Sequence, residues 1–421
     1  MKKIIAFLSL LISFLPSLVT ADEFKAKAEH AVAVEASTGK ILYEKDATTP
    51  DAIASITKIL TVYMVYREID KGNLAWDTEV EISDYPYQLT VNPEASNVPM
   101  EARKYKVKDL VNATMIASAN SAAIALAEHI GGSEPKFVDM MSQQLKEWGI
   151  RDAKLVNASG LNNQVLGDHI YPGSKETDEN MMSAKDVAII AQHLINDYPD
   201  VLTFSKKSKE LFDGTEIITS NQLLLDDENT FEIDGLKTGT TELAGASIVA
   251  TANKNNMRII SVVLNADNWK ENDYARFEAT KNILDNVYNR FEKVKVINKD
   301  QTYQDQSVPI SSSIVEKIMP IASSDFYIVK PRTEKSIKLN FTPQKTKLTA
   351  PIIKNKTLAT LAFQDDYKIG DGYLNQVPQV EMVSPKNIDK NGLIDISIFH
   401  LTQFMNNIKL KSYQIQEEYL K

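Results

Sequence analysis

The chain has 421 residues, of which 43% are hydrophobic and 24% charged. This is an ordinary globular composition, and the chain is long enough for two or three domains. The formal charge of -9 at pH 7 repels phosphate backbones and argues against nucleic acid as a partner. The lack of cysteine excludes disulfides and a thiol nucleophile, and the five histidines form no metal-binding pattern. We therefore expect no metal and no cofactor, and a serine enzyme here would need a base other than histidine.

The first 21 residues have the features of a secretory signal peptide. Two lysines precede an apolar run, residues 4–18, and residues 19–21 end in the small side chain of a cleavage site. A membrane-spanning anchor is the alternative, but the run is shorter than the ~20 residues that a span needs and contains Pro16. We expect export, with the mature chain beginning at Asp22.

A serine and a lysine stand three residues apart in the next part of the chain. Residues 31–43 predict a β-hairpin, and residues 53–69 predict a long apolar helix that carries Ser55 and Lys58 near its beginning. Residues three apart share a helix face, so the hydroxyl and the amine can meet. The amine can activate the serine only if burial, the helix dipole or a second cation lowers its pKa from ~10.4.

The Ser-x-x-Lys spacing is a weak signal by itself. It recurs at Ser133 and Lys136, where a proline predicts a solvated helix start, and Ser55 could equally be an N-cap. Two later motifs favour catalysis: Ser118-Ala119-Asn120, at an expected break between helices, and Lys237-Thr238-Gly239, in an expected strand. Taken alone, the first of these would be a helix cap. Together the three stand in the order found in penicillin-binding proteins and class A β-lactamases.

The remaining pattern up to residue 291 indicates an α/β plan. Residues 164–180 are polar and predict a surface loop. Apolar periodicity predicts helices at 107–130, 137–148, 187–195 and 274–288, and strands at 232–239, 246–251 and 258–264. Because strands at both ends enclose a helical block, we expect one mixed domain.

The character of the chain changes after residue 291. Short strands predict a small β-sandwich, and from Gly392 the sequence turns helical. One stripe of that helix is apolar, formed by Ile394, Ile398, Leu401, Met405 and Ile408, and its polar side carries Asp395, Thr402, Asn406 and Lys409. A helix on a membrane surface is the favoured interpretation, and a helix packed on the sandwich or on a partner is the alternative.

From about residue 30 to about residue 410, the chain resembles the D-alanyl-D-alanine carboxypeptidases, which are low-molecular-mass penicillin-binding proteins. The three motifs and the segment Asn157-Ala158-Ser159-Gly160-Leu161 carry the resemblance, together with residues 35–58, 183–186 and 234–264. It implies a serine enzyme that removes the terminal D-alanine from peptidoglycan stem pentapeptides through an acyl-enzyme on Ser55. It also implies that β-lactam antibiotics acylate and inhibit the enzyme.

The resemblance implies the architecture as well. We expect a signal peptide at 1–21, then a catalytic domain of the β-lactamase/DD-peptidase type at 22–291, with an antiparallel sheet, helices on both faces and a helical block. A small β-sandwich domain should follow at 292–387, and an amphipathic membrane-associating helix and tail at 388–421. The expected location is the periplasmic face of the cytoplasmic membrane, as a peripheral protein.

Roles for the motif residues follow from what acyl transfer demands. Ser55 attacks the carbonyl of the penultimate alanine, and Lys58 as free base accepts its proton. Ser118 returns a proton to the leaving amine, and Lys237 holds Ser118 and lowers the Lys58 pKa. Asn120 steadies Lys58 and bonds the substrate amide.

Substrate binding is expected along the strand of the third motif. Lys237, Thr238 and Arg258 are the expected partners of the substrate carboxylate. Gly239 leaves room for the substrate backbone, and the backbone NH of Thr240 joins that of Ser55 in an oxyanion hole.

The sequence departs from the family pattern in three places. Thr240 stands where an aromatic residue or histidine is common, Ser121 stands where an aspartate often follows the asparagine, and the loop at 164–180 looks longer than usual. These departures affect substrate preference more than reaction class. The rival functions are a DD-endopeptidase, a β-lactamase and a module that binds β-lactams without turnover. A class A β-lactamase would need a glutamate before Leu161-Asn162, and none stands there.

Overall fold

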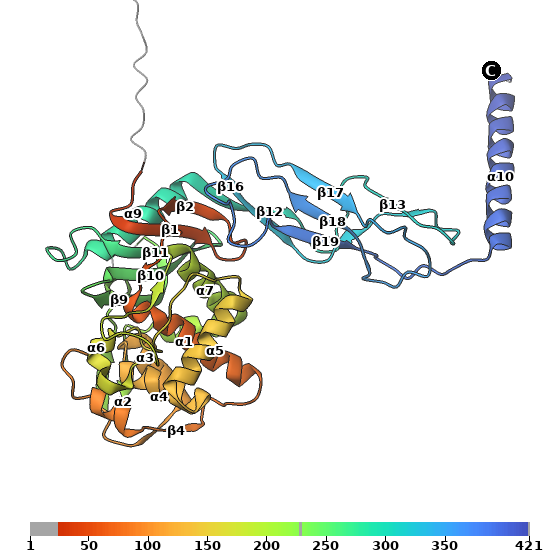
Figure 1. Ribbon diagram of the computed structural model, residues 1–421. Coiled ribbons are helices and arrows are strands. Elements are labelled where there is room, and N and C mark those ends of the chain that lie inside the picture. Colours follow the sequence, from red (N-terminus) through yellow and green to blue (C-terminus); the bar gives the residue numbers. More distant parts are fainter. Residues whose placement is uncertain (1–23, 227–229, 420–421) are drawn as a thin grey trace, which may run out of the picture.

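The computed structural model describes residues 24–226 and 230–419. The expected signal peptide, residues 1–21, lies outside this part of the chain. Figure 1 shows a large mixed body, an elongated β domain beside it, and a C-terminal helix, α10, at the far end. The predicted order of a mixed α/β domain, a β domain and a final helix is therefore what the structure has.

A five-stranded antiparallel sheet forms the centre of the large body, in the order β2-β1-β11-β10-β9. Successive side chains along each strand point to opposite faces, so Val249 and Val262 join one hydrophobic core while Ile248 and Val263 join the other. The predicted strands are confirmed. The five strands are β1 (Ala28–Glu35), β2 (Ile41–Lys45), β9 (Glu232–Thr241), β10 (Gly245–Lys254) and β11 (Met257–Ala266).

Helices cover both faces of this sheet. Helix α9 (Ala275–Arg290) packs on one face, and α7 (Ala184–Asp197) packs on the other. Beyond α7 lies the helical block, which contains α1 (Lys58–Asp70), α3 (Val107–Ile116), α4 (Asn120–Gly131) and α5 (Glu134–Glu147). The predicted break within residues 107–130 is confirmed, since α3 ends before residue 117 and α4 begins after residue 119.

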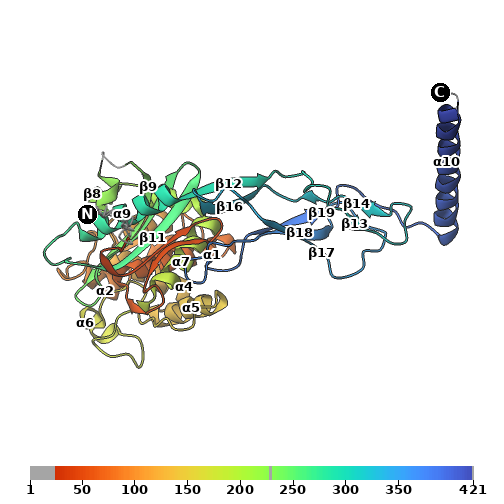
Figure 2. The same ribbon diagram turned by 90° about the horizontal axis from the view of Figure 1, so that it is seen from above.

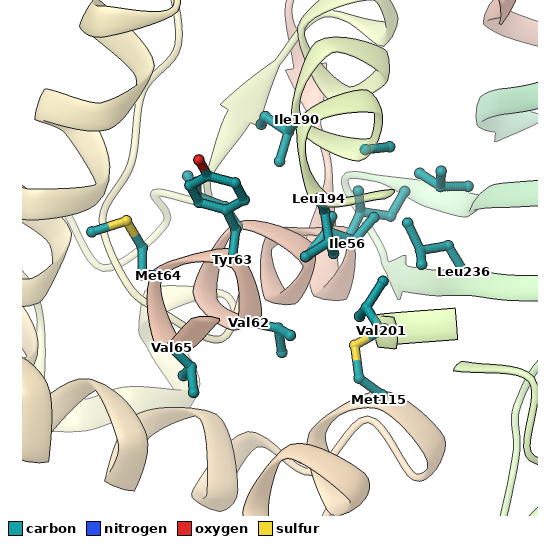
Figure 3. Close-up of a cluster of buried hydrophobic side chains, with 14 of the residues drawn as sticks. Ile56, Val62, Tyr63, Met64, Val65, Met115, Ile190, Leu194, Val201 and Leu236 are labelled. Atoms are coloured by element: carbon teal, nitrogen blue, oxygen red, sulfur yellow. The ribbon is translucent and has the colours of Figure 1, made fainter. Parts of the chain in front are cut away.

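Helix α1 lies at the centre of the helical block. Ten of its 13 residues are buried, as expected for a helix that is apolar on all sides. In Figure 3, Ile56 and the α1 side chains lie among Ile190 and Leu194 of α7, Met115 of α3 and Leu236 of β9. The predicted helix at 53–69 begins later than expected, because residues Ala54–Thr57 form a 3-10 turn before α1. Packing on every side fixes this turn, and with it Ser55.

Short elements complete the large body, which corresponds to the expected catalytic domain at 22–291 and is called the catalytic body below. The loop expected at 164–180 includes helix α6 and a 3-10 turn, Gly167–His169. The short helices are α2 (Asp84–Leu89), α6 (Asn163–Leu166) and α8 (Leu202–Ser205), and the short strands are β3 (Asp51–Ala52), β4 (Glu79–Glu81), β5 (Lys104–Lys106), β6 (Met181–Met182), β7 (Lys209–Phe212) and β8 (Thr215–Ile218).

The second domain has three small sheets around its own hydrophobic core. Strand β12 (Phe291–Ile297) pairs with β16 (Phe326–Pro331), and β13 (Val308–Pro309) pairs with β14 (Lys317–Ile318). The third sheet has the order β15-β19-β18-β17, with β15 (Ile321–Ala322), β17 (Leu339–Pro343), β18 (Thr357–Phe363) and β19 (Gln379–Val383).

A loop of the second domain, residues 364–375, reaches back to the catalytic body. The NH of Ile41 donates to Gly372 O (2.9 Å), and the NH of Leu374 donates to Gly39 O (2.8 Å). Between these bonds, Lys40 forms an ion pair with Asp365, and their side chains are 1% and 2% exposed. The second domain is therefore anchored to the β1–β2 turn as well as by the covalent link at residue 291.

Helix α10 (Leu393–Tyr419) stands apart from both domains in Figures 1 and 2. All five residues of its predicted apolar stripe are exposed, from 49% at Ile408 to 75% at Ile394. A polar contact joins His400 to Glu316 of the second domain (3.3 Å). The structure therefore does not cover the stripe with the β domain. In the part of the chain that the structure describes, no helix is long and apolar enough to cross a membrane.

Candidate active site

Ser55 lies where the strand β9 meets the 3-10 turn before α1. A Cβ placed on Gly239 would come within 2.9 Å of Ile53 O and 3.1 Å of the Ser55 nitrogen. Real Cβ atoms almost never approach this closely, so glycine is needed for the strand to pass the turn. That Gly239 leaves room for the substrate backbone stays a prediction, because the close neighbours found here belong to residues 53–55.

Lys58 places its amine between three oxygen atoms. Its Nζ lies 2.8 Å from Ser55 Oγ, 2.7 Å from Asn120 Oδ1 and 2.6 Å from Ser159 O. The side chain is fully buried, and burial, followed by repulsion from Lys237, holds the Lys58 pKa well below its usual value. An unprotonated amine has two N–H groups and one lone pair. When the two carbonyl oxygens accept both N–H groups, the lone pair is left for the Ser55 hydroxyl.

Asn120 is held in one orientation at the first turn of α4. Its Nδ2 donates to Ser96 O (2.8 Å), so its Oδ1 faces Lys58. This supports the expected role of Asn120 in steadying Lys58. Ser118 occupies the connection between α3 and α4 with a φ of 58°, a left-handed conformation that costs energy in a serine. This backbone conformation puts Ser118 on the wall of the same cavity as Ser55.

Lys237 lies on β9, is 2% exposed, and donates from Nζ to Thr238 O (2.9 Å). Burial and the nearby charge of Arg276 lower its pKa to about 7. The structure places Lys237 close enough to repel charge on Lys58, as predicted. Among the hydrogen bonds of the described residues, none joins Lys237 to Ser118, so the expected direct contact is not present.

A cavity of about 360 Å³ opens over these residues. Its walls come from the 3-10 turn, the α3–α4 connection, the outer face of β9 and the start of α9. It is lined by Ser55, Ser96, Ala117, Ser118, Ser220, Gln222, Thr238, Gly239, Thr240, Asp273, Tyr274, Arg276 and Phe277. Thr238 and Thr240 both face it, and the Ser220 and Thr238 hydroxyls lie 2.6 Å apart. The site therefore combines a serine hydroxyl, a buried lysine amine beside it and a wall rich in hydroxyl groups.

Comparison with known proteins agrees with this geometry. The family model described as D-alanyl-D-alanine carboxypeptidase matches residues 17–268, and one described as the C-terminal domain of penicillin-binding protein 5 matches residues 291–390. The chain belongs to the D-alanyl-D-alanine carboxypeptidase family.

Curated relatives of this carboxypeptidase include the D-alanyl-D-alanine carboxypeptidases DacF of Bacillus subtilis and DacA of Escherichia coli. The first is 29% identical over 88% of this chain and 92% of its own length, and the second is 28% identical over 81% and 80%. Among solved structures, PBP3 from Streptococcus pneumoniae, described as a peptidoglycan synthesis regulatory factor, is 48% identical with a TM-score of 0.82, over 87% of this chain and 100% of that one. Ampicillin-bound penicillin-binding protein D2 from Listeria monocytogenes is 28% identical with a TM-score of 0.53, over 63% and 99%.

The structure does not bring Arg258 into the carboxypeptidase site. Its guanidinium pairs with both oxygens of Asp234 (2.7 and 2.8 Å) and with the Thr251 hydroxyl (2.8 Å). Arg258 lies beside Asn253 at the β10–β11 turn, and it is not among the residues that line the cavity. The prediction of Arg258 as a carboxylate partner is therefore not supported, because its donors already serve a structural ion pair.

Arg276 lines the cavity, whereas Arg258 does not. Arg276 is the second residue of α9 and donates from Nη1 to Gly239 O (3.0 Å) and Ser247 O (3.2 Å). Its buried Nε has no partner among the described residues, and burial lowers its pKa to about 10, so it stays charged at neutral pH. No motif or spacing marked this arginine, because its place depends on where α9 crosses the sheet.

Thr240 and Ser121, which depart from the family pattern, lie in different environments. Thr240 lines the cavity, so it can contact a bound peptide. Ser121 is fully buried, and its NH donates to Asn97 Oδ1 (2.8 Å). Its hydroxyl has no partner among the described residues. Substrate preference can therefore depend on Thr240 directly and on Ser121 only through packing.

Proposed function

We propose that Ser55 is the nucleophile and Lys58 the general base of this serine-type D-Ala-D-Ala carboxypeptidase. The observation that carries the proposal is the buried Lys58 amine, 2.8 Å from Ser55 Oγ, with two carbonyl oxygens placed to accept its N–H groups. A lysine held in this way can take the serine proton at neutral pH. No histidine lines the cavity to compete for that role.

The reaction then has two half-steps. Ser55 Oγ attacks the carbonyl carbon of the penultimate D-alanine while Lys58 takes the hydroxyl proton. The C–N bond breaks, the amine of the terminal D-alanine receives a proton through the Ser118 hydroxyl, and an ester remains on Ser55. Water then attacks the ester and gives a proton to Lys58. Lys58 returns this proton to the leaving Ser55 Oγ, and the shortened stem peptide departs with a new carboxylate. The backbone NH groups of Ser55 and Thr240 are our proposed oxyanion hole.

The free carboxylate of the peptide is the recognition handle. We propose that Thr238, Thr240 and Arg276 bind this carboxylate. The positive charge of Lys237, on β9, also attracts it. Cations and hydroxyls are the ordinary partners of a carboxylate, and these hydroxyls line the same cavity as Ser55. The substrate backbone would lie along the outer edge of β9, as an added strand.

β-Lactams are expected to acylate Ser55 and to leave slowly. A penicillin's leaving amine stays tethered to the acyl group and blocks the approach of water. A glutamate that holds a separate water molecule beside the ester would favour the β-lactamase alternative. Glu134 does contact the segment after Asn157, but from behind, and it does not line the cavity. The penicilloyl ester should therefore outlast the peptide acyl group.

We also propose that α10 binds the periplasmic face of the cytoplasmic membrane as an in-plane helix. Its exposed apolar stripe and opposite polar face support this. The boundaries 22–291, 292–387 and 388–421 remain our proposed division of the mature chain, with residues 1–21 as an export signal.

The test uses the secreted chain, a peptide ending in D-Ala-D-Ala, and a fluorescent penicillin. Free D-alanine should appear, and the label should sit on Ser55 and decay more slowly than the peptide turns over. Lys58→Ala should abolish both activities, while Lys136→Ala, which removes the exposed lysine of the second Ser-x-x-Lys match, should change neither. Retained labelling in Lys58→Ala would overturn the assignment of the base.

A further inference from the structure

A buried segment, residues 156–161, lies directly behind the Lys58 amine. Its Ser159 carbonyl is the third oxygen around Nζ, and its Ala158 carbonyl accepts from the Thr61 hydroxyl of α1 (2.6 Å). Gly160 has a φ of +81°, and a Cβ there would lie 1.8 Å from Ala54 O. The segment is therefore pressed against the turn that carries Ser55, with no space for movement toward it.

Asn180 ties this segment to the start of α1. The residue is fully buried, and its Oδ1 accepts from the NH groups of Val156 (2.6 Å) and Asn157 (3.2 Å). Its Nδ2 donates to Asn157 O (2.9 Å) and to the hydroxyl of Thr57 (2.9 Å), the residue immediately before Lys58. The Asn180 side-chain amide therefore makes all the hydrogen bonds it can form with the segment and the turn.

Glu134 holds the same segment from the opposite side. It is the first residue of α5 and 5% exposed, and its Oε1 accepts from the NH of Ala158 (2.8 Å) while Oε2 accepts from the Tyr85 hydroxyl (3.2 Å). Neither Asn180 nor Glu134 lines the cavity. Both are buried polar groups that the reaction itself does not use.

We infer that Asn180 and Glu134 are positioning residues for the base: they fix the Ser159 carbonyl so that it takes one N–H of Lys58 and leaves the lone pair for Ser55. This inference rests on the proposed role of Lys58. If the carbonyl withdrew, the amine could turn about its terminal bond and present a hydrogen to the serine. A base in the wrong orientation slows acylation even when it is unprotonated.

The electrostatic consequence has a definite sign. A carbonyl oxygen stabilises an ammonium more than a neutral amine, because it accepts from a full positive charge. Removing the Ser159 contact therefore lowers the Lys58 pKa further. The acylation rate should fall at its plateau, and the acid limb of its pH profile should move to lower pH.

The first test is Asn180→Ala, with acylation by fluorescent penicillin measured from acid to alkaline pH in the full mature chain. We expect a plateau rate lower by about 10- to 100-fold and an acid limb at lower pH. The matched control is Asn163→Ala, which removes another fully buried amide that donates to Ser174 and Lys175 and not to the segment. The control can lose stability, but its pH profile should be that of the wild type. An unchanged rate and limb in Asn180→Ala would overturn the inference.

Glu134 supplies the second test, which decides the matter if Asn180→Ala does not fold. Glu134→Ala removes the acceptor for the Ala158 NH and should slow acylation, whereas Glu134→Gln keeps an acceptor of the same length and should restore the rate. Equal rates in Glu134→Ala and the wild type would contradict the inference. A wild-type enzyme that is not acylated at Ser55 would instead overturn the proposed function on which it rests.

Discussion

Single residues of the site differ in whether their charge or their geometry matters. Lys237 acts on Lys58 mainly as a charge, since no hydrogen bond joins their side chains among the described residues and its Nζ donates to Thr238 O. For the proposed role of Lys58 as base, geometry matters, because three oxygen atoms surround its amine at 2.6 to 2.8 Å. Substitution of Lys58 and substitution of Lys237 should therefore change acylation in different ways.

Replacing Lys237 with methionine should move the acid limb of the acylation profile. The positive charge of Lys237 disfavours the ammonium form of Lys58, so its removal raises the Lys58 pKa and shifts the limb to higher pH. The effect should be largest below about pH 7, where Lys237 is itself protonated. Acylation rates of the wild type and Lys237→Met across pH test this. A limb that stays in place would show that the two lysines are not coupled.

The two arginines give a paired prediction. Arg276→Ala should lower kcat/KM for the peptide by the loss of one charge-assisted bond, roughly 1.5 to 3 kcal/mol, or about 10- to 150-fold. Arg258→Ala should leave KM unchanged and lower the melting temperature, because it strands Asp234, whose side chain is only 14% exposed. Steady-state kinetics and thermal unfolding of both variants separate these outcomes. A raised KM in Arg258→Ala alone would restore the original assignment.

At the scale of elements, α10 differs from every other long helix. The helices of the catalytic body bury their apolar residues, whereas α10 exposes the whole of its apolar stripe from residue 394 to residue 408. A helix with an apolar and a polar side and no protein cover is suited to a membrane surface. The neighbouring β domain has a closed core of its own and does not need the helix.

A chain ending at Gly392 should therefore be soluble and active. In the full chain, Leu401→Asp should weaken association with anionic vesicles, and Asn406→Asp, which adds the same charge on the polar side, should do so far less. Vesicle flotation and D-alanine release measure the two properties. If the shortened chain still floats with vesicles, another surface binds the membrane.

At the scale of the whole molecule, a buried ion pair joins the two domains. Lys40 of the catalytic body meets Asp365 of the second domain, and the Tyr373 hydroxyl also donates to that carboxylate (2.7 Å). Backbone bonds on both sides of Lys40 continue the contact. The long β domain is thereby held in a fixed direction from the active site.

Removing one member of this pair should destabilise the protein strongly. Lys40→Met leaves Asp365 buried without its cation, at a cost of about 3 to 5 kcal/mol. Lys338→Met is the matched control, since Lys338 pairs with Asp366 on the surface with both side chains more than half exposed, and water screens such pairs so that they add little stability. Urea unfolding of both variants measures the difference. Equal losses would mean that the buried pair does not tie the domains together.

Most of the fold and the centre of the site could be predicted from the sequence. Alternating and helical periodicities gave the strands of the sheet, the block of helices and the break at Ser118, because local sterics and the burial of one face act over a few residues. Ser55 and Lys58 could be paired because residues three apart on a helical turn are neighbours. Asn120 and Lys237 came from the order of the three motifs and the family resemblance. These features depend little on distant parts of the chain.

Tertiary structure alone decided the partners of these residues. Arg276 rather than Arg258 faces the cavity because the start of α9 brings it to Gly239 O of β9 and Ser247 O of β10. The position of α9 is set by its packing on the sheet, mainly on β10 and β11. Ser159 and Asn180 meet Lys58 and Thr57 across more than a hundred residues of sequence. Lys40 and Asp365 are 325 residues apart. No local sequence pattern predicts contacts of this kind, because each partner by itself looks like an ordinary polar residue. Only the folded chain brings the two partners together.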